Sequence, residues 1–225
     1  MWTSFHGSSS DEPPTREQVE QWQRRMSPPE NEFPAGVGMT VLLGRTGDAA
    51  VGLTQVEAFS SGFRFTLAVR LRQASPQLAH GGLFMLISAH VHPGMEVPLE
   101  DRLLLGIEYA DGRRASTLHD IRMEGPSAVP DGDQLVLAQQ GGGGGELSVD
   151  QTFWVAPLPP PGPLTVVLTW PGFGMAESRT VLDGAAIRAA ASHSQVLWPP
   201  QPAVEFREPP PSPRPSSGWF AEPPD

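Results

Sequence analysis

Residues 63–72 read FRFTLAVRLR, with a large apolar side chain at every odd-numbered position. Side chains on a β-strand point alternately to its two faces, so this segment would have one apolar face and one polar face. In a helix the same five apolar side chains would be scattered around the whole circumference. Burying them is worth roughly 1.5–3 kcal/mol each and requires a second apolar layer. The segment therefore predicts a half-buried strand in a layered β fold.

Apolar segments of strand length continue on both sides of residues 63–72. They predict further strands at 39–43, 51–59, 83–87, 103–109, 113–118, 134–140, 146–156 and 164–170, and residues 177–182 are a candidate for a last strand. The run at 83–87 is apolar on both parities, which is typical of a strand covered on both sides. The apolar parity changes near Gln55, which predicts a β-bulge, and Asp111-Gly112 predicts a tight hairpin turn. We therefore expect an all-β fold, namely a two-sheet antiparallel β-sandwich, Ig-like or jelly-roll-like, of roughly seven to nine strands.

A helix is expected at each end of this sandwich. Thr15, Arg16, Glu17 and Gln18 form a capping-box sequence, which predicts a helix over residues 15–27. Asp183 is a suitable N-cap for a second helix over residues 184–197. The chain would then consist of an N-terminal arm (1–36), a β-sandwich domain (37–198) and a proline-rich tail that we expect to be disordered (199–225).

The composition argues against several functional classes. The 225 residues carry a formal net charge of −10, whereas duplex DNA and anionic membranes attract clustered cations, so we expect neither as a partner. The chain has no cysteine and no lysine, which excludes disulfides, cysteine-ligated zinc, the P-loop lysine and Schiff-base chemistry. It shows no signal-peptide pattern and no apolar run long enough to span a membrane, so we expect a cytoplasmic protein.

Five consecutive glycines, 141–145, resemble a phosphate-binding loop only superficially. No Gly-Lys-Ser/Thr sequence follows them, and no helical pattern begins there. The glycine run is therefore interpreted as a flexible hairpin connection between two strands.

Four sequence motifs carry a family resemblance. They are the glycine run, the segment FWVAPLPPPGPLT at 153–165, Trp170-Pro171 and Leu197-Trp198-Pro199. In these motifs the chain resembles a family of uncharacterised actinobacterial β-sandwich proteins, over residues 39–200. The resemblance implies a fold and a lineage, and it implies no activity.

His90-Val91-His92 is the sharpest candidate for a chemical site. Two histidines at i and i+2 of a strand point to the same side, and this spacing can hold a divalent metal ion. The alternative interpretation is a strand end running into a turn at Pro93-Gly94, with both histidines as ordinary polar groups. The sequence shows no Gly-x-Ser-x-Gly nucleophile elbow, and we identify no catalytic residue. We therefore expect a protein that is not an enzyme and, apart from this metal, has no cofactor.

Candidate binding residues lie on one strand face and in the tail. Trp154 is out of phase with its apolar neighbours and faces away from the core, either as packing or, if exposed, as a binding face with Arg64 and Arg70. In the tail, prolines and aromatic residues could bind a partner or fold back onto the domain: Pro210, Pro213, Trp219 and Phe220.

These patterns predict a non-enzymatic intracellular protein-binding or scaffold module that uses a sheet face and the proline-rich tail. The alternative is a metal-dependent or carbohydrate-binding site around His90 and His92. A protein partner is expected, and homo-oligomerisation through exposed strand edges is a further hypothesis. The fold class alone does not indicate a more specific function.

Overall fold

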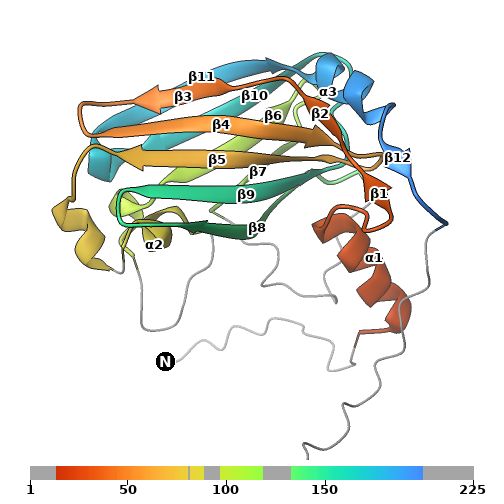
Figure 1. Ribbon diagram of the computed structural model, residues 1–225, viewed down its shortest axis with the longest axis horizontal. Coiled ribbons are helices and arrows are strands. Elements are labelled where there is room, and N and C mark those ends of the chain that lie inside the picture. Colours follow the sequence, from red (N-terminus) through yellow and green to blue (C-terminus); the bar gives the residue numbers. More distant parts are fainter. Residues whose placement is uncertain (1–13, 81, 89–96, 119–132, 200–225) are drawn as a thin grey trace, which may run out of the picture.

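The computed structural model describes residues 14–80, 82–88, 97–118 and 133–199, and antiparallel β-strands are their main secondary structure (Figure 1). The larger sheet has six strands: β2 (Ala35–Val37), β3 (Val41–Arg45), β4 (Ala49–Ala58), β5 (Phe63–Leu71), β9 (Ser148–Ala156) and β8 (Val136–Gly144). Strands β2 and β3 pair with one edge of β4, and β5 pairs with its other edge. The order then continues from β5 through β9 to β8.

The remaining strands form two smaller sheets within the described part of the chain. The four-stranded sheet has the order β11 (Met175–Asp183), β10 (Pro163–Trp170), β6 (Leu104–Tyr109) and β7 (Arg114–Ser116). The two-stranded sheet pairs β1 (Glu32–Phe33) with β12 (Gln195–Val196). The α-helices are α1 (Arg16–Met26), α2 (Leu83–Ile87) and α3 (Gly184–Ala191), and short 3-10 turns lie at η1 (Pro76–His80), η2 (Leu99–Asp101) and η5 (Pro171–Phe173).

Strand β5 confirms the alternation predicted for residues 63–72. Its odd-numbered side chains are buried, and four of them are no more than 1% exposed: Phe63, Phe65, Leu67 and Val69. Phe65 stacks on Phe153 of the neighbouring strand β9, with ring centroids 5.6 Å apart. The even-numbered side chains point to the other side, where Arg70 is exposed. The strand therefore has one face in the core and one face directed outward.

The two larger sheets contribute to a single hydrophobic core. In Figure 1 the four-stranded sheet lies behind the six-stranded sheet. Side chains of alternating positions in β6 and β10 belong to the same cluster as those of β5: Leu105, Ile107, Tyr109, Leu164, Val166, Leu168 and Trp170. The indole nitrogen of Trp170 donates to the Asp101 carbonyl at 2.9 Å, so its polar atom is satisfied although the ring is buried.

Both end helices are present, and the second one is shorter than predicted. Thr15 caps α1 in a complete capping box with Gln18, as the sequence predicts. Asp183 caps α3 by accepting a hydrogen bond from the Ala185 amide at 2.9 Å. The helix expected to reach residue 197 instead ends at Ala191. Residues 195–196 leave the helical pattern because they pair with β1, which is distant in the sequence.

The strand predicted at residues 83–87 is wrong, because this segment forms the short helix α2. A run that is apolar on both parities can be buried either as a strand or as a helix, and periodicity does not separate the two. Gly82 precedes the helix with φ 83°, a conformation that favours glycine. Leu83, Leu86 and Ile87 are all buried in the shared core.

The glycine run is also corrected, because most of it lies inside strand β8 rather than in a loop. Gly142, Gly143 and Gly144 pair with consecutive residues of β9 after a register shift. A Cβ atom on Gly144 would lie 2.0 Å from the Ser148 carbonyl oxygen, whereas a Cβ atom on Gly143 would meet nothing within 4 Å. Close backbone packing therefore explains the glycine at 144.

This difference predicts opposite outcomes for two neighbouring substitutions. Gly144→Ala should lower the free energy of unfolding by about 1–3 kcal/mol, because the backbone of β9 has to move. Gly143→Ala should leave it unchanged or raise it by up to about 1 kcal/mol, because the unfolded chain loses conformational freedom. Urea denaturation of the two variants measures the difference. Equal stability of the two variants would contradict the close-packing explanation.

Candidate functional site

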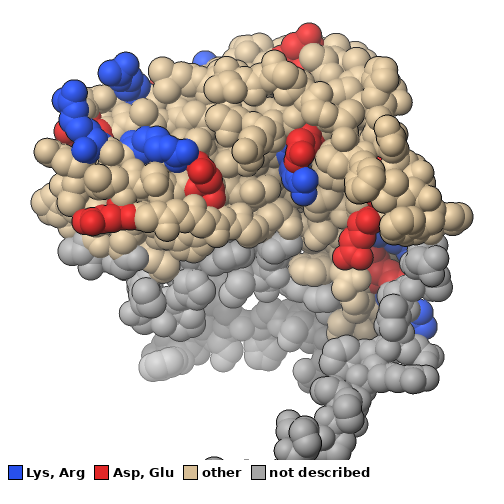
Figure 2. Space-filling model, viewed as in Figure 1, with Lys and Arg blue, Asp and Glu red and all other residues tan. Residues whose placement is uncertain are grey.

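The side of the six-stranded sheet that faces away from the shared core, called the outer face, carries mostly small and polar side chains. Three rows of cross-strand neighbours show this: Thr54, Thr66 and Thr152; Gly52, Ala68 and Asp150; and Ala50, Arg70 and Ser148. Figure 2 shows charged side chains near the two ends of this face and an uncharged expanse between them. Between the row of threonines and the Arg70–Asp150 ion pair, the β4 and β5 positions of the outer face are therefore small and neutral.

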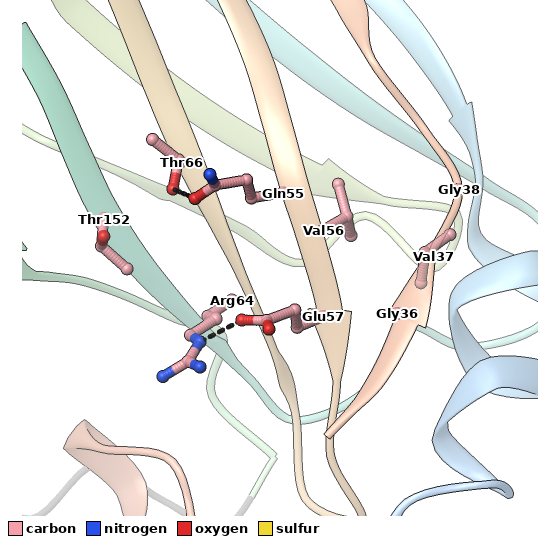
Figure 3. A pocket seen from close by; sticks show the side chains of 9 residues that line it. All are labelled: Gly36, Val37, Gly38, Gln55, Val56, Glu57, Arg64, Thr66 and Thr152. Carbon is pink, nitrogen blue, oxygen red and sulfur yellow. Dashed lines mark hydrogen bonds and ion pairs between the residues drawn. The ribbon is translucent and has the colours of Figure 1, made fainter. Parts of the chain in front are cut away.

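A depression of ≈ 760 Å³ lies on the outer face where β2, β4, β5 and β9 meet (Figure 3). Its lining residues come from these four strands: Gly36, Val37, Gly38, Gln55, Val56, Glu57, Arg64, Thr66 and Thr152. The side chains of Gln55, Glu57, Arg64, Thr66 and Thr152 give it hydrogen-bonding groups. The glycines of the β2 segment leave it open on that side, because they carry no side chain.

Gln55 owes its position to the β-bulge predicted from the sequence. The register between β4 and β5 shifts between Thr54 and Glu57, and Gln55 has φ 50°, in the left-handed region that non-glycine residues rarely adopt. Its side-chain oxygen accepts a hydrogen bond from the Thr66 hydroxyl at 3.0 Å. The extra residue thus places an exposed carboxamide over the row of threonines. The parity change indicated the bulge, but nothing in the sequence indicated the depression.

Arg64 and Glu57 form an ion pair at the same end of the outer face. The Arg64 Nε atom donates to a Glu57 carboxylate oxygen, and its guanidinium group lies 5.3 Å from the centre of the Phe59 ring. Both side chains are about one-third exposed, so the pair contributes at most about 1 kcal/mol to stability. Its more certain effect is to hold the guanidinium group at the depression.

Arg70 lies on the outer face as predicted, but the fold does not bring it near Arg64. The two arginines are six positions apart on β5, a separation of about 20 Å at the usual rise of a strand. Arg70 pairs with Asp150 at 2.7 Å and also donates to the Val69 carbonyl. The outer face therefore ends in one ion pair on each side.

Trp154 takes the packing role, which was one of the two roles that the sequence left open for it, and not that of an exposed binding residue. It does face away from the shared core, but it is 0% exposed. Helix α1 covers it, and its indole nitrogen donates to the Arg25 carbonyl at 3.0 Å. It packs in a second hydrophobic cluster under α1, together with Met26, Phe59, Val136, Ala138 and Ala156. Periodicity predicted which side Trp154 faces, but the docking of α1 decides its exposure.

Several predicted site residues lie outside the described residues. These are His90 and His92 of the metal hypothesis and Pro210, Pro213, Trp219 and Phe220 of the tail, so their roles stay predictions. Within the described ranges, no three histidine, aspartate or glutamate side chains cluster in a way that could hold a metal ion. None of the helices described is long and apolar enough to cross a membrane.

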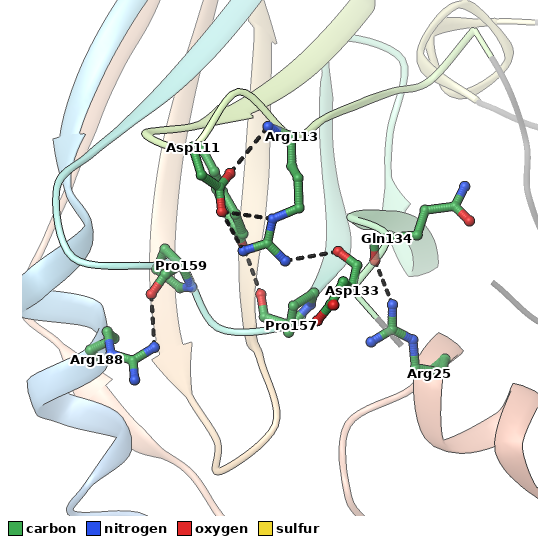
Figure 4. A network of polar contacts seen from close by, with 9 residues as sticks. Arg25, Asp111, Arg113, Asp133, Gln134, Pro157, Pro159 and Arg188 are labelled. Atoms are coloured by element: carbon green, nitrogen blue, oxygen red, sulfur yellow. Dashed lines mark hydrogen bonds and ion pairs between the residues drawn. The ribbon is translucent and has the colours of Figure 1, made fainter. Parts of the chain in front are cut away.

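A second polar cluster ties the β6–β7 hairpin to the chain before β8 (Figure 4). Arg113 donates to the Asp111 carboxylate at 2.8 Å and to the Asp133 carbonyl at 2.8 Å. The hydrogen bond to Arg113 holds the pKa of Asp111 below its usual value, and the same bond raises the pKa of Arg113. The Tyr109 hydroxyl donates to the Pro157 carbonyl at 2.6 Å. These three hydrogen bonds all end on groups of the chain itself, namely one carboxylate and two backbone carbonyls. We therefore assign the cluster a structural role.

Searches with protein-family models, among curated proteins and among solved structures find no match to the chain.

Gln55 gives a test of the bulge that separates strain from hydrogen bonding. Gln55→Gly removes the cost of the left-handed conformation, about 1–2 kcal/mol, and also loses a hydrogen bond worth about 0.5–1.5 kcal/mol. The two effects oppose each other, so the free energy of unfolding should stay within about 1 kcal/mol of that of the parent chain. Gln55→Ala keeps the conformational cost and loses the hydrogen bond, so it should be less stable than Gln55→Gly. Urea denaturation measures both variants. The bulge interpretation fails if the alanine variant is the more stable one.

Tyr109 is the only tyrosine in the chain, which makes its ionisation directly observable. Burial raises the pKa of the Tyr109 hydroxyl above its usual value, because the phenolate would lose its hydration. The stability that this shift contributes is present below the unfolded-state pKa of about 10 and decreases as the pH rises above it. Phenolate absorbance should therefore appear only together with loss of the circular dichroism of the fold. The urea-unfolded chain, as control, should titrate near pH 10; a folded chain doing the same would contradict the assignment.

Proposed function

We propose that this chain is a non-enzymatic protein-binding module whose partner contacts the outer face of the six-stranded sheet, with the proline-rich tail as a second binding element. The observation that supports this proposal is the composition of the outer face. Its centre is an uncharged surface of Gly52, Ala68 and three threonines, and its ends carry the ion pairs of Arg64 and Arg70 (Figure 2).

A surface of this composition suits a protein partner for energetic reasons. Small side chains lose little conformational entropy when a partner covers them. A centre without charges avoids the large cost of dehydrating ions, and the ion pairs at the rim can orient the partner. The depression at Gln55 adds hydrogen-bonding groups at one end of the same surface.

The proposal also includes the arrangement of the two larger sheets. We take the two larger sheets as the layers of a β-sandwich of Ig-like or jelly-roll-like type, in keeping with the resemblance to actinobacterial β-sandwich proteins. The shared core supports this, as does the proximity of two edge strands. The Ser178 hydroxyl of β11 donates to the Leu43 carbonyl of β3 at 2.9 Å, so the edges of the two sheets meet there.

Two arginine substitutions on opposite sides of the molecule test the proposed binding face. Ala68→Arg places a long charged side chain in the centre of the outer face, opposite Asp150. Thr165→Arg places one on the outward side of the four-stranded sheet, opposite Glu108, and is the matched control. Ala68→Arg should abolish co-purification of the partner from extracts of the source organism, because the long side chain prevents close approach of the partner to this surface of small residues.

The control should retain the same partner at the parental yield. Circular dichroism and thermal unfolding should be the same for both variants, since each new arginine faces solvent and an acidic neighbour. Retention of the partner by Ala68→Arg together with its loss in Thr165→Arg would move the binding face to the other sheet.

A further inference from the structure

The depression at Gln55 contains more hydrogen-bond donors than the described residues use. The two terminal guanidinium nitrogens of Arg64, the amide nitrogen of Gln55 and the hydroxyl of Thr152 have no hydrogen-bond partner in the described part of the chain. The charge of Arg64 is already balanced by Glu57. The depression therefore suits a ligand that offers acceptors and needs no negative charge, such as the carbonyl oxygens of a peptide.

A proline-rich peptide is the polypeptide that offers backbone acceptors with the fewest competing backbone donors. Proline has a carbonyl but no backbone N–H, and the extended polyproline II conformation leaves the carbonyls free for outside partners. Residues 209–215 of this chain read PPPSPRP, so five of their seven positions have no backbone donor. This segment matches the unused donors of the depression.

The tail follows residues that are bonded to Asn31, five positions before Gly36 of the depression. The carbonyl of Trp198, the last residue before Pro199, accepts a hydrogen bond from the Asn31 side chain at 2.7 Å. The Leu197 amide donates to the Asn31 carbonyl at 2.8 Å. Asn31 is followed within a few residues by β2 and Gly36, which line the depression. The chain between 199 and 209 reaches about 30 Å in the polyproline II conformation, which spans the width of the sheet.

Because it is tethered, the proline-rich segment of the same chain has an advantage over segments of other molecules in occupying the depression. A segment joined by a short linker has an effective concentration of about 1 mM at a neighbouring site, so even weak binding is satisfied within the chain. The depression has no aromatic side chain among its lining residues, so hydrogen bonds rather than ring stacking would hold the ligand. Such contacts are weak between separate molecules and sufficient within one molecule.

We propose that the depression around Gln55 binds proline-rich segments through their carbonyl oxygens, and that its resident ligand is residues 209–215 of the same chain. This inference rests on the proposed function, because the depression is part of the proposed binding face. It adds a specific ligand for that part. A partner that covers the outer face would displace the segment, which would then be free for binding elsewhere.

Disulfide trapping in the full chain tests this proposal, because the chain has no cysteine of its own. Gly36→Cys places a thiol at the depression and is combined with Ser212→Cys in the tail. Gly106→Cys, on the outward side of the four-stranded sheet, is combined with Ser212→Cys as the matched control. A Cβ atom fits at both glycines, with nothing within 4 Å at Gly36 and only contacts of 3.6 Å or more at Gly106.

Under mild oxidation the Gly36→Cys pair should form an intramolecular disulfide at least about tenfold faster than the control pair. Rates are normalised to the reactivity of each single-cysteine variant with a small disulfide reagent. Adding Gln55→Gly, which removes one donor, should slow the first pair severalfold and leave the control unchanged. Peptide mapping of the non-reduced chain by mass spectrometry identifies the bond.

Equal rates for the two pairs would overturn the proposal. A covalent dimer in place of the intramolecular product would overturn the assignment to the same chain. The result is separate from that of the Ala68→Arg test, because disulfide formation requires no partner and partner capture requires no docked tail. If the disulfide test contradicts the docked tail, the proposed binding face is still tested by Ala68→Arg, and the reverse also holds.

Discussion

The structure depends on the burial of apolar side chains from the two larger sheets in one shared core. Strand β5 lies in the middle of the six-stranded sheet, and its odd-numbered side chains are almost completely buried. They meet the apolar positions of β6 and β10 in one continuous cluster. An amphipathic sheet is stable only when its apolar side is covered, so this contact determines which side of every strand is left to face outward.

The outward side of the six-stranded sheet is shaped by two local departures from a regular sheet. The bulge in β4 turns Gln55 into the left-handed region and aims its side chain over the threonine row. Helix α1 covers the β8–β9 part of the same end of the sheet through Met26 and Trp154, which is the cross-strand neighbour of Arg64, and removes that part from solvent. What is left between the helix and the strand edges is a neutral surface with a polar depression (Figures 2 and 3). A surface of this kind offers hydrogen-bonding groups at one end of an otherwise small and neutral surface.

The charge distribution supports the same interpretation. The chain is strongly acidic overall, yet the charges on the outer face occur as the pairs Arg64–Glu57 and Arg70–Asp150. Paired charges orient a partner without requiring one of opposite net charge. The Trp198 carbonyl, directly before the proline-rich tail, is bound to Asn31, which precedes β1 and β2 in the chain.

The sequence alone determined the strand pattern, the burial of the odd residues of 63–71, the bulge near Gln55 and the caps at Thr15 and Asp183, because each is set by a short-range period or a local hydrogen bond. Only the tertiary structure decided the rest. Residues 83–87 became a helix, the glycine run joined a strand, residues 195–196 paired with β1, and Trp154 was buried by α1. Each of these outcomes depends on a contact between segments distant in sequence or on the space that such a contact leaves. The depression at Gln55 has the same origin, since four strands meet there and no single segment encodes their meeting.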